Sequence, residues 1–153
     1  MVILLKDAKL KYGEIVNGKW VNESKWMVVY KPPQWFQDKV LNSASGKPCK
    51  SIYLNKDMLK PLDLALADIK ALGLDSELKT FDGCFMIRSV RGDPNSPSTH
   101  SYGLAIDFNA KDNPLGGVVQ FSEQFLNCFK SHGFACGANF KRKDGMHFSF
   151  AWE

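Results

Sequence analysis

Two histidines and two aspartates, which lie in two separate segments of the chain, are the residues whose types and spacing best suit chemistry. The first segment runs from Ser98 to Asp107 and places His100 seven residues before Asp107. The second segment reads Asp-Gly-Met-His, with Asp144 three residues before His147. Two imidazoles and one carboxylate leave a fourth position of zinc open for water, which is the pattern of catalytic zinc sites. A second carboxylate nearby suits the removal of a proton from that water.

Alternation of side chains predicts that both segments contain strands. Between residues 102 and 108, bulky apolar residues alternate with a set that ends in a carboxylate: Gly103, Ala105 and Asp107. We expect the bulky side to face a core, and the small side to leave room for a metal ion and its water. His100 is expected in a loop just before this strand. In the second segment, apolar residues alternate with His147, so His147 points off the face opposite to them.

These two segments resemble the motifs of a known peptidase family. The pattern Ser98-x-His100-x-x-Gly103-x-Ala105-x-Asp107, followed by Asp144-x-x-His147-Phe148, is similar to that of zinc D-Ala-D-Ala carboxypeptidases and L-alanyl-D-glutamate endopeptidases. This group also includes VanX and VanY dipeptidases and the Hedgehog amino-terminal fold. Segments 81–88 and 139–147 look like those of its phage-encoded endolysin members. The resemblance covers residues 50–151 and implies that His100, Asp107 and His147 bind Zn²⁺ and that Asp144 is the catalytic base.

The resemblance also implies a functional arginine upstream of the Ser-x-His motif. Arg88 fits that place best, and Arg91 is the alternate, which we assign to substrate binding. A guanidinium suits either a carboxylate or the oxyanion of a tetrahedral intermediate. Two roles are open for Ser98, since its hydroxyl suits both a hydrogen bond to substrate and stabilisation of the loop.

Two alternatives to a zinc peptidase use the same residues. Cys84 or Cys136 could join His100 and Asp107 in a thiol peptidase triad, and Cys136 could instead close the zinc site as a fourth ligand. We favour small buried hydrophobes for both cysteines. Cys84 is expected in a hairpin strand and not at a helix start that would lower its pKa. The other alternative is a non-enzymatic, zinc-containing binding module of the Hedgehog type. The carboxylate of Asp144 argues against it, because a structural zinc needs no such neighbour.

Composition places the chain among globular proteins and narrows its partners. The 153 residues are 44% hydrophobic and 24% charged, which predicts one domain over residues 1–153. The resemblance implies that 50–151 is the family-like core and leaves 1–49 less defined. The net charge of +4, without a run of Lys and Arg, gives no basis for binding nucleic acid. The expected partner is bacterial peptidoglycan.

The amino terminus bears on how such an enzyme would reach its substrate. Residues 1–6 contain too short an apolar run for a signal peptide or a membrane span. We therefore expect synthesis in a host cytoplasm without a signal peptide, no membrane insertion, and action on the cell wall or carriage in a virion. Phage holin or tail proteins are the expected partners in delivery.

The remaining pattern predicts an α+β fold, in which a small antiparallel sheet carries the zinc site and helices pack against it. Helical spacing of apolar residues predicts two helices, each with a capping residue before it and glycine after it. The expected elements are an initial strand and polar connection within 1–24, a strand at 25–31, a helix at 57–72 capped by Asn55 or Asp57, a hairpin about Asp82-Gly83, and a helix at 123–132 capped by Ser122. His132, at a helix end, is left out of the site.

Overall fold

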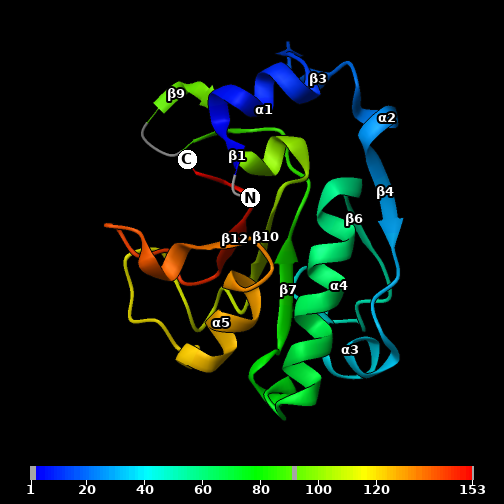
Figure 1. Cartoon of the computed structure of the whole chain (residues 1–153), viewed down its shortest axis with the longest axis vertical. Coiled ribbons are helices and arrows are strands. Elements are labelled where there is room, and N and C mark those ends of the chain that lie inside the picture. Colours follow the sequence, from blue (N-terminus) through cyan, green and yellow to red (C-terminus); the bar gives the residue numbers. More distant parts are fainter. Residues whose placement is uncertain (1–2, 91–92, 153) are drawn as a thin grey trace.

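A five-stranded sheet lies at the centre of the computed structural model, which describes residues 3–90 and 93–152 (Figure 1). Its strands follow the order β11, β12, β10, β7, β5. Neighbouring strands are antiparallel except β5 and β7, which are parallel. The strands are β5 (Leu41–Asn42), β7 (Thr80–Gly83), β10 (Ala105–Phe108), β11 (Ala135–Cys136) and β12 (His147–Ser149).

Short strand pairs and helices surround this sheet. The pairs are β1 (Ile3–Leu4) with β13 (Ala151–Trp152), β2 (Ile15–Val16) with β3 (Lys19–Trp20), β4 (Met27–Tyr30) with β6 (Ile52–Asn55), and β8 (Ser89–Val90) with β9 (Asp93–Pro97). The α-helices are α1 (Leu5–Tyr12), α2 (Glu23–Trp26), α3 (Gln34–Lys39), α4 (Lys56–Ala71) and α5 (Glu123–Lys130). The 3-10 helices are η1 (Asp75–Glu77), η2 (Thr99–Tyr102) and η3 (Gly137–Asn139). The predicted α+β class is confirmed.

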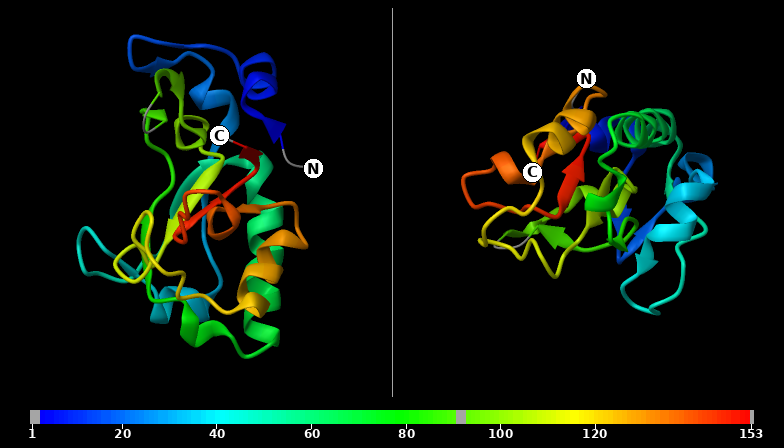
Figure 2. Two further views of the ribbon diagram at one scale, coloured as in Figure 1. Left: turned by 90° about the vertical axis from the view of Figure 1, so that its left-hand side faces the viewer. Right: turned by 90° about the horizontal axis from the view of Figure 1, so that it is seen from below.

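The sheet presents its bulky side chains to α4 and α5, which lie on one side of it (Figure 2). The rings of Phe108 on β10 and Phe148 on β12 lie 6.1 and 4.1 Å from that of Phe129 on α5. Because side chains alternate along a strand, Asp107 and His147 are directed to the opposite face. Packing of the apolar core therefore sets the orientation of both polar residues.

The two predicted helices are confirmed, with small differences at their ends. Asn55, and not Asp57, caps α4, because its side chain accepts a hydrogen bond from the backbone N–H of Asp57. Ser122 caps α5 in the same way, and α5 ends at Lys130 rather than at His132. The predicted strand at 25–31 is shorter, because residues 25 and 26 belong to α2.

The predicted hairpin about Asp82-Gly83 is wrong. Strand β7 ends at Gly83 and pairs with β10 and β5, and it does not pair with residues 84–87. The carboxylate of Asp82 accepts hydrogen bonds from the Thr80 hydroxyl and the Ala110 backbone N–H. It therefore holds β7 to the segment after β10 instead of closing a two-residue turn.

The amino-terminal segment also differs from the expectation of a strand and a polar connection. Helix α1 follows β1 directly, and a hairpin of β2 and β3 comes next. Its turn residues Asn17 and Gly18 have φ of 52° and 74°, the left-handed values of a two-residue hairpin turn. Across the described residues, no helix is both long and apolar enough to cross a membrane.

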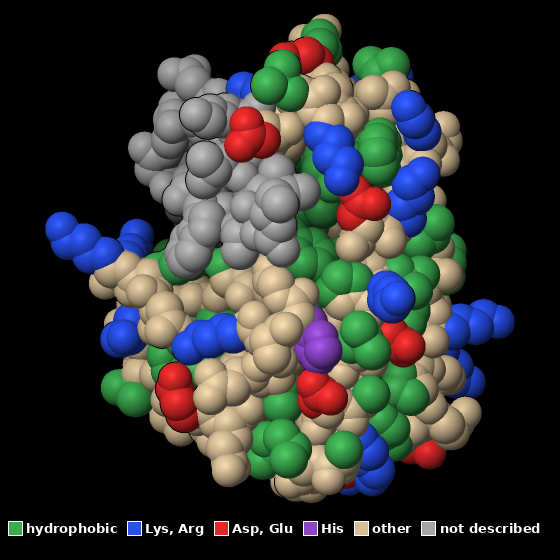
Figure 3. All heavy atoms as spheres, viewed as in Figure 1, with side chains coloured by type: hydrophobic (Ala, Val, Ile, Leu, Met, Phe, Trp, Pro, Cys, Tyr) green, Lys and Arg blue, Asp and Glu red, His purple; other side chains and the backbone are tan. Residues whose placement is uncertain are grey.

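The face of the molecule seen in Figure 3 carries interspersed acidic and basic side chains. His132, which lies two residues after α5, has its Nε2 2.6 Å from the carboxylate of Asp68 on α4. His132 therefore links two helices, which agrees with leaving it out of the site.

Candidate metal centre

His100 on η2 and His147 on β12 both lie next to the carboxylate of Asp107 on β10. Asp107 on β10 and His147 on β12 are direct cross-strand partners. His100 lies on η2, a 3-10 helix rather than the expected loop, and Gly103 in the left-handed conformation ends this helix before β10 begins. The potential ligand atoms of His100, Asp107 and His147 all lie within 4.8 Å of one another.

The distances within this group fit a tetrahedral ion. His100 Nε2 lies 3.3 Å from Asp107 Oδ2, and His147 Nδ1 lies 3.3 Å from Asp107 Oδ1. Two ligand atoms at zinc–nitrogen or zinc–oxygen distances are about 3.3 Å apart on a tetrahedral ion. His100 Nε2 and Asp107 Oδ1 are also buried without a hydrogen bond to any described residue. Because buried polar atoms are nearly always bonded, these two atoms fit a site that binds a cation.

The imidazole of His100 is held in the tautomer that a metal requires. His100 Nδ1 lies 2.7 Å from the backbone oxygen of Cys84. A carbonyl only accepts hydrogen bonds, so Nδ1 carries a proton, and Nε2 is the ring nitrogen that would coordinate a metal. His100 is buried, with 3% of the residue exposed, so solvent competes little for its ring nitrogens. The backbone carbonyl of Cys84 is part of the site, and no sequence motif predicts it.

The carboxylate of Asp107 is in its charged form. Burial by itself would raise its pKa, but the neighbouring imidazoles of His100 and His147 outweigh burial and hold the pKa of Asp107 well below its usual range. Its side chain is 18% exposed. An ionised carboxylate between two imidazoles supplies one negative charge to a bound dication.

One part of the expectation for the first segment is wrong. Gly103 is outside the strand and does not make room for a metal. A Cβ atom there would lie 2.6 Å from the sulfur of Met27 and 2.9 Å from the backbone nitrogen of Asn55. The glycine is required by this close approach and by its φ of 65°.

Asp144 is joined by a backbone hydrogen bond to His147 and is not a member of the group of potential metal ligands. Its carbonyl accepts a hydrogen bond from the His147 N–H at 3.0 Å, and its own N–H donates to Gly137 at 2.9 Å. The turn from Asp144 to His147 is therefore closed on itself and fixed to η3. The group of potential metal ligands among the described residues does not include Asp144.

The structure gives different results for Ser98, Arg88 and Arg91, the predicted substrate-binding and oxyanion residues. Ser98 is buried, and its hydroxyl accepts from the His100 N–H, so it caps the helix that carries His100. The backbone of Arg88 is fixed by Ser98 and by both hydrogen bonds of the Ser101 hydroxyl. The Arg88 guanidinium donates to the carbonyl of Ser89. Arg91 lies outside the described residues.

The cysteines offer no nucleophile. All four are buried and free, and Cys84 and Cys136 are outside the group of potential metal ligands. Burial raises the pKa of the Cys84 thiol far above neutrality, with a further rise from the charge of Asp107. Burial raises the pKa of Cys136 to about 12. Both thiols are protonated at neutral pH, which removes the basis for a thiol peptidase triad.

Comparison with known families agrees with the geometry. Residues 91–150 match a family described as D-alanyl-D-alanine carboxypeptidase. The match supports assignment to this peptidase family. It contains both motif segments, covers less than half of the chain, and leaves α1 to α4 outside. No curated protein and no solved structure matches the chain.

Proposed function

We propose that this protein is a zinc-dependent peptidase that hydrolyses peptide bonds in the stem peptides of bacterial peptidoglycan. The observation that carries the proposal is the group of His100, Asp107 and His147, with ligand atoms within 4.8 Å of one another. Two of those atoms, His100 Nε2 and Asp107 Oδ1, are buried and form no hydrogen bond with a described residue. The match to a carboxypeptidase family provides the substrate class.

In the proposed hydrolysis, the metal ligands, Asp144 and Arg88 each have a separate role. A bound zinc ion would polarise the scissile carbonyl and lower the pKa of a water molecule to about 7. His100, fixed by Cys84, presents Nε2, and Asp107 contributes a negative charge. Asp144 accepts the proton of the attacking water at its carboxylate and passes it to the leaving amine. Arg88 donates hydrogen bonds to the developing oxyanion.

The finer proposal is a phage endolysin or a virion-associated wall enzyme. Its support is the resemblance of segments 81–88 and 139–147 to phage-encoded members. Delivery by a holin or by tail proteins follows from that setting. The scissile bond is L-Ala-D-Glu, D-Ala-D-Ala or a cross-link, and these give products of different mass.

The test is digestion of purified peptidoglycan by the zinc-loaded protein, followed by mass spectrometry of the fragments. We expect new amino and carboxyl termini within the stem peptides, and their formation should be strongly slowed with Asp144→Asn. A protein that binds zinc and releases no fragment from any peptidoglycan type would instead behave as a Hedgehog-type binding module.

A further inference from the structure

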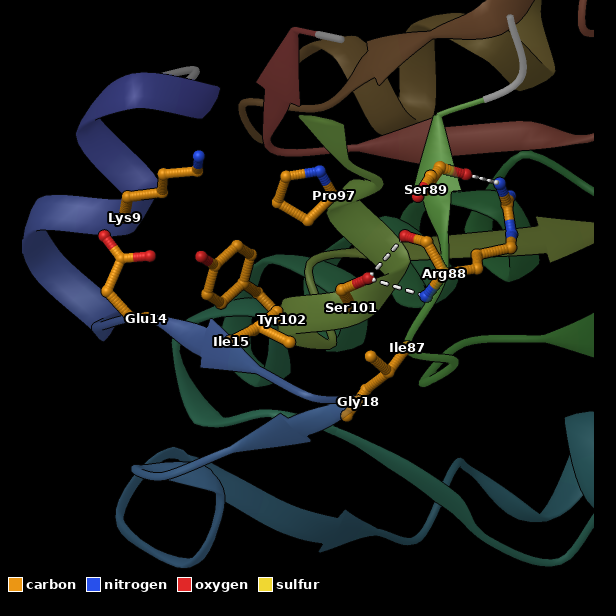
Figure 4. Close-up of a pocket in the computed structure, with 10 residues that line it drawn as sticks. All are labelled: Lys9, Glu14, Ile15, Gly18, Ile87, Arg88, Ser89, Pro97, Ser101 and Tyr102. Carbon is orange, nitrogen blue, oxygen red and sulfur yellow. Dashed lines mark hydrogen bonds between the residues drawn. The ribbon is translucent and has the colours of Figure 1, made fainter. Parts of the chain in front are cut away.

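A pocket of about 490 Å³ lies next to the helix that carries His100 (Figure 4). Ser101 and Tyr102, which directly follow His100 on η2, line one side. Lys9 on α1 and Glu14 in the following turn line another side. The volume is within the range of small-molecule sites. The lining residues from the amino-terminal segment, Lys9, Glu14, Ile15 and Gly18, lie outside the family match.

Two opposite charges face this pocket without neutralising each other. The side chains of Lys9 and Glu14 extend toward the space in front of Pro97 and Tyr102 (Figure 4). In the described part of the chain, neither forms an ion pair or a hydrogen bond, either with the other or with a third residue. An ammonium and a carboxylate held apart on one pocket wall are complementary to a ligand that carries the same two charges in reverse.

The rest of the wall is fixed before any ligand arrives. The hydroxyl of Tyr102 donates to the carbonyl of Gly13 at 3.1 Å, and its oxygen retains a lone pair that accepts. Burial, and then the charge of Glu14, raise the pKa of Tyr102 to about 12, so the phenol is neutral. The hydroxyl of Ser101 bonds both the N–H and the carbonyl of Arg88. Lys9, Glu14 and Arg88 are the charged residues that line the pocket, and the side chains of Lys9 and Glu14 are the two without a hydrogen bond to another described residue.

We infer that this pocket binds a zwitterionic amino-acid group of the substrate, one carbon that bears both an ammonium and a carboxylate. Lys9 contacts the carboxylate and Glu14 contacts the ammonium. The inference rests on the proposed function and refines it, because it selects stem peptides whose diamino acid ends in such a group. Stem peptides with a lysine side chain carry the ammonium but lack the adjacent carboxylate.

The test compares two tripeptide probes by calorimetric titration of the zinc-loaded Asp144→Asn protein, which should bind without cleavage. One probe is L-alanyl-γ-D-glutamyl-meso-diaminopimelate, and the other has L-lysine as its third residue. We expect the unsubstituted pocket to bind the first about tenfold or more tightly than the second, since one charge-assisted hydrogen bond is lost. Lys9→Gln should abolish this preference, and Glu14→Gln should weaken both probes.

The matched control is Lys19→Gln, which removes the same charge from the same amino-terminal region at an exposed position outside the pocket. It should leave the preference intact. Equal affinity for the two probes, or an equal loss for both in Lys9→Gln, would overturn the inference. Failure of the proposed function would appear differently, as an absence of wall fragments with the binding preference retained.

Discussion

Gly137 lies so close to the Asp144–His147 turn that a Cβ atom there would be 2.2 Å from the carbonyl oxygen of Asp144 and 3.0 Å from Cβ of His147. The φ of Gly137 is not in the left-handed region, so space alone demands glycine. The Asp144 N–H donates to the carbonyl of the same glycine. The close approach of Gly137 therefore fixes where the turn that carries the proposed base and a proposed metal ligand sits against η3.

Gly137→Ala should push this turn away from η3 and lower turnover by about a hundredfold, the effect of a misplacement near 1 Å. Overpacking should also reduce the free energy of unfolding by about 1–3 kcal/mol. Gly73→Ala is the control, since Gly73 has a φ of 69°, open space around it and a place at the end of α4. It should lose stability and keep turnover, measured by denaturant unfolding and peptidoglycan digestion. Equal loss of turnover in both variants would contradict a positioning role.

Metal analysis should find one zinc ion per chain. His147→Ala should lose zinc, while His132→Ala, which removes the histidine that pairs with Asp68, should keep it. Because a ligand that binds only the folded state stabilises it, removal of zinc by a chelator should lower the melting temperature of the wild type. The chelator should have no such effect on His147→Ala. Equal zinc content in wild type and His147→Ala would refute the ligand assignment.

Asp144→Asn should separate proton transfer from metal binding. The amide keeps the shape of the side chain and removes its basicity, so turnover should fall by about 10² to 10⁴ while zinc content and unfolding are unchanged. If Asp144 served only as a surface charge beside Lys141 to Lys143, the loss would be small, as for exposed ion pairs of about 0–1 kcal/mol. Loss of zinc in this variant would make Asp144 a ligand.

Arg88→Ala should lower turnover by on the order of a hundredfold with zinc retained, because an oxyanion donor is removed. Arg88→Lys should recover part of the loss, since a single ammonium lacks the planar pair of donors. Arg91→Ala is the comparison, and kinetics on the same digested peptide decide between the two. A loss confined to Arg91→Ala would assign the oxyanion role to Arg91.

The lowered pKa of Asp75 should make the free energy of unfolding depend on pH in the acid range. Its hydrogen bond with Lys39, assisted by Lys70, lowers the pKa of Asp75 to about 2. A depressed pKa in the folded state stabilises the protein above the unfolded value near 4, and this contribution is lost as the pH falls toward 2. Unfolding of wild type and Asp75→Asn should therefore differ most near neutral pH, and the difference should shrink at low pH. Asp112→Asn, which breaks an exposed pair with Lys79, should have little effect.

The sequence by itself determined the features that depend on local spacing. The two motif segments, the α+β class, and helices α4 and α5 with their capping residues follow from residue types a few positions apart. Such features are encoded locally because helix periodicity, capping hydrogen bonds and strand alternation involve neighbours in the chain. The hairpin turn at Asn17-Gly18 carried a local signal of the same kind, although it was not predicted.

Tertiary structure decided what depends on contacts between distant segments. The Asp82 carboxylate accepts a hydrogen bond from the backbone N–H of Ala110, which follows β10. This contact holds Asp82 within the sheet, so Asp82-Gly83 does not form the predicted hairpin turn. Gly103 makes way for Met27, so the need for glycine there comes from a partner far along the chain, and Gly137 makes way for the turn at Asp144. The tautomer of His100 depends on a backbone oxygen at Cys84, and every residue type supplies one. The sequence does not predict the Cys84 carbonyl contact, the close approach at Gly103 or the pocket lining. These features arise only when packing brings separate segments together.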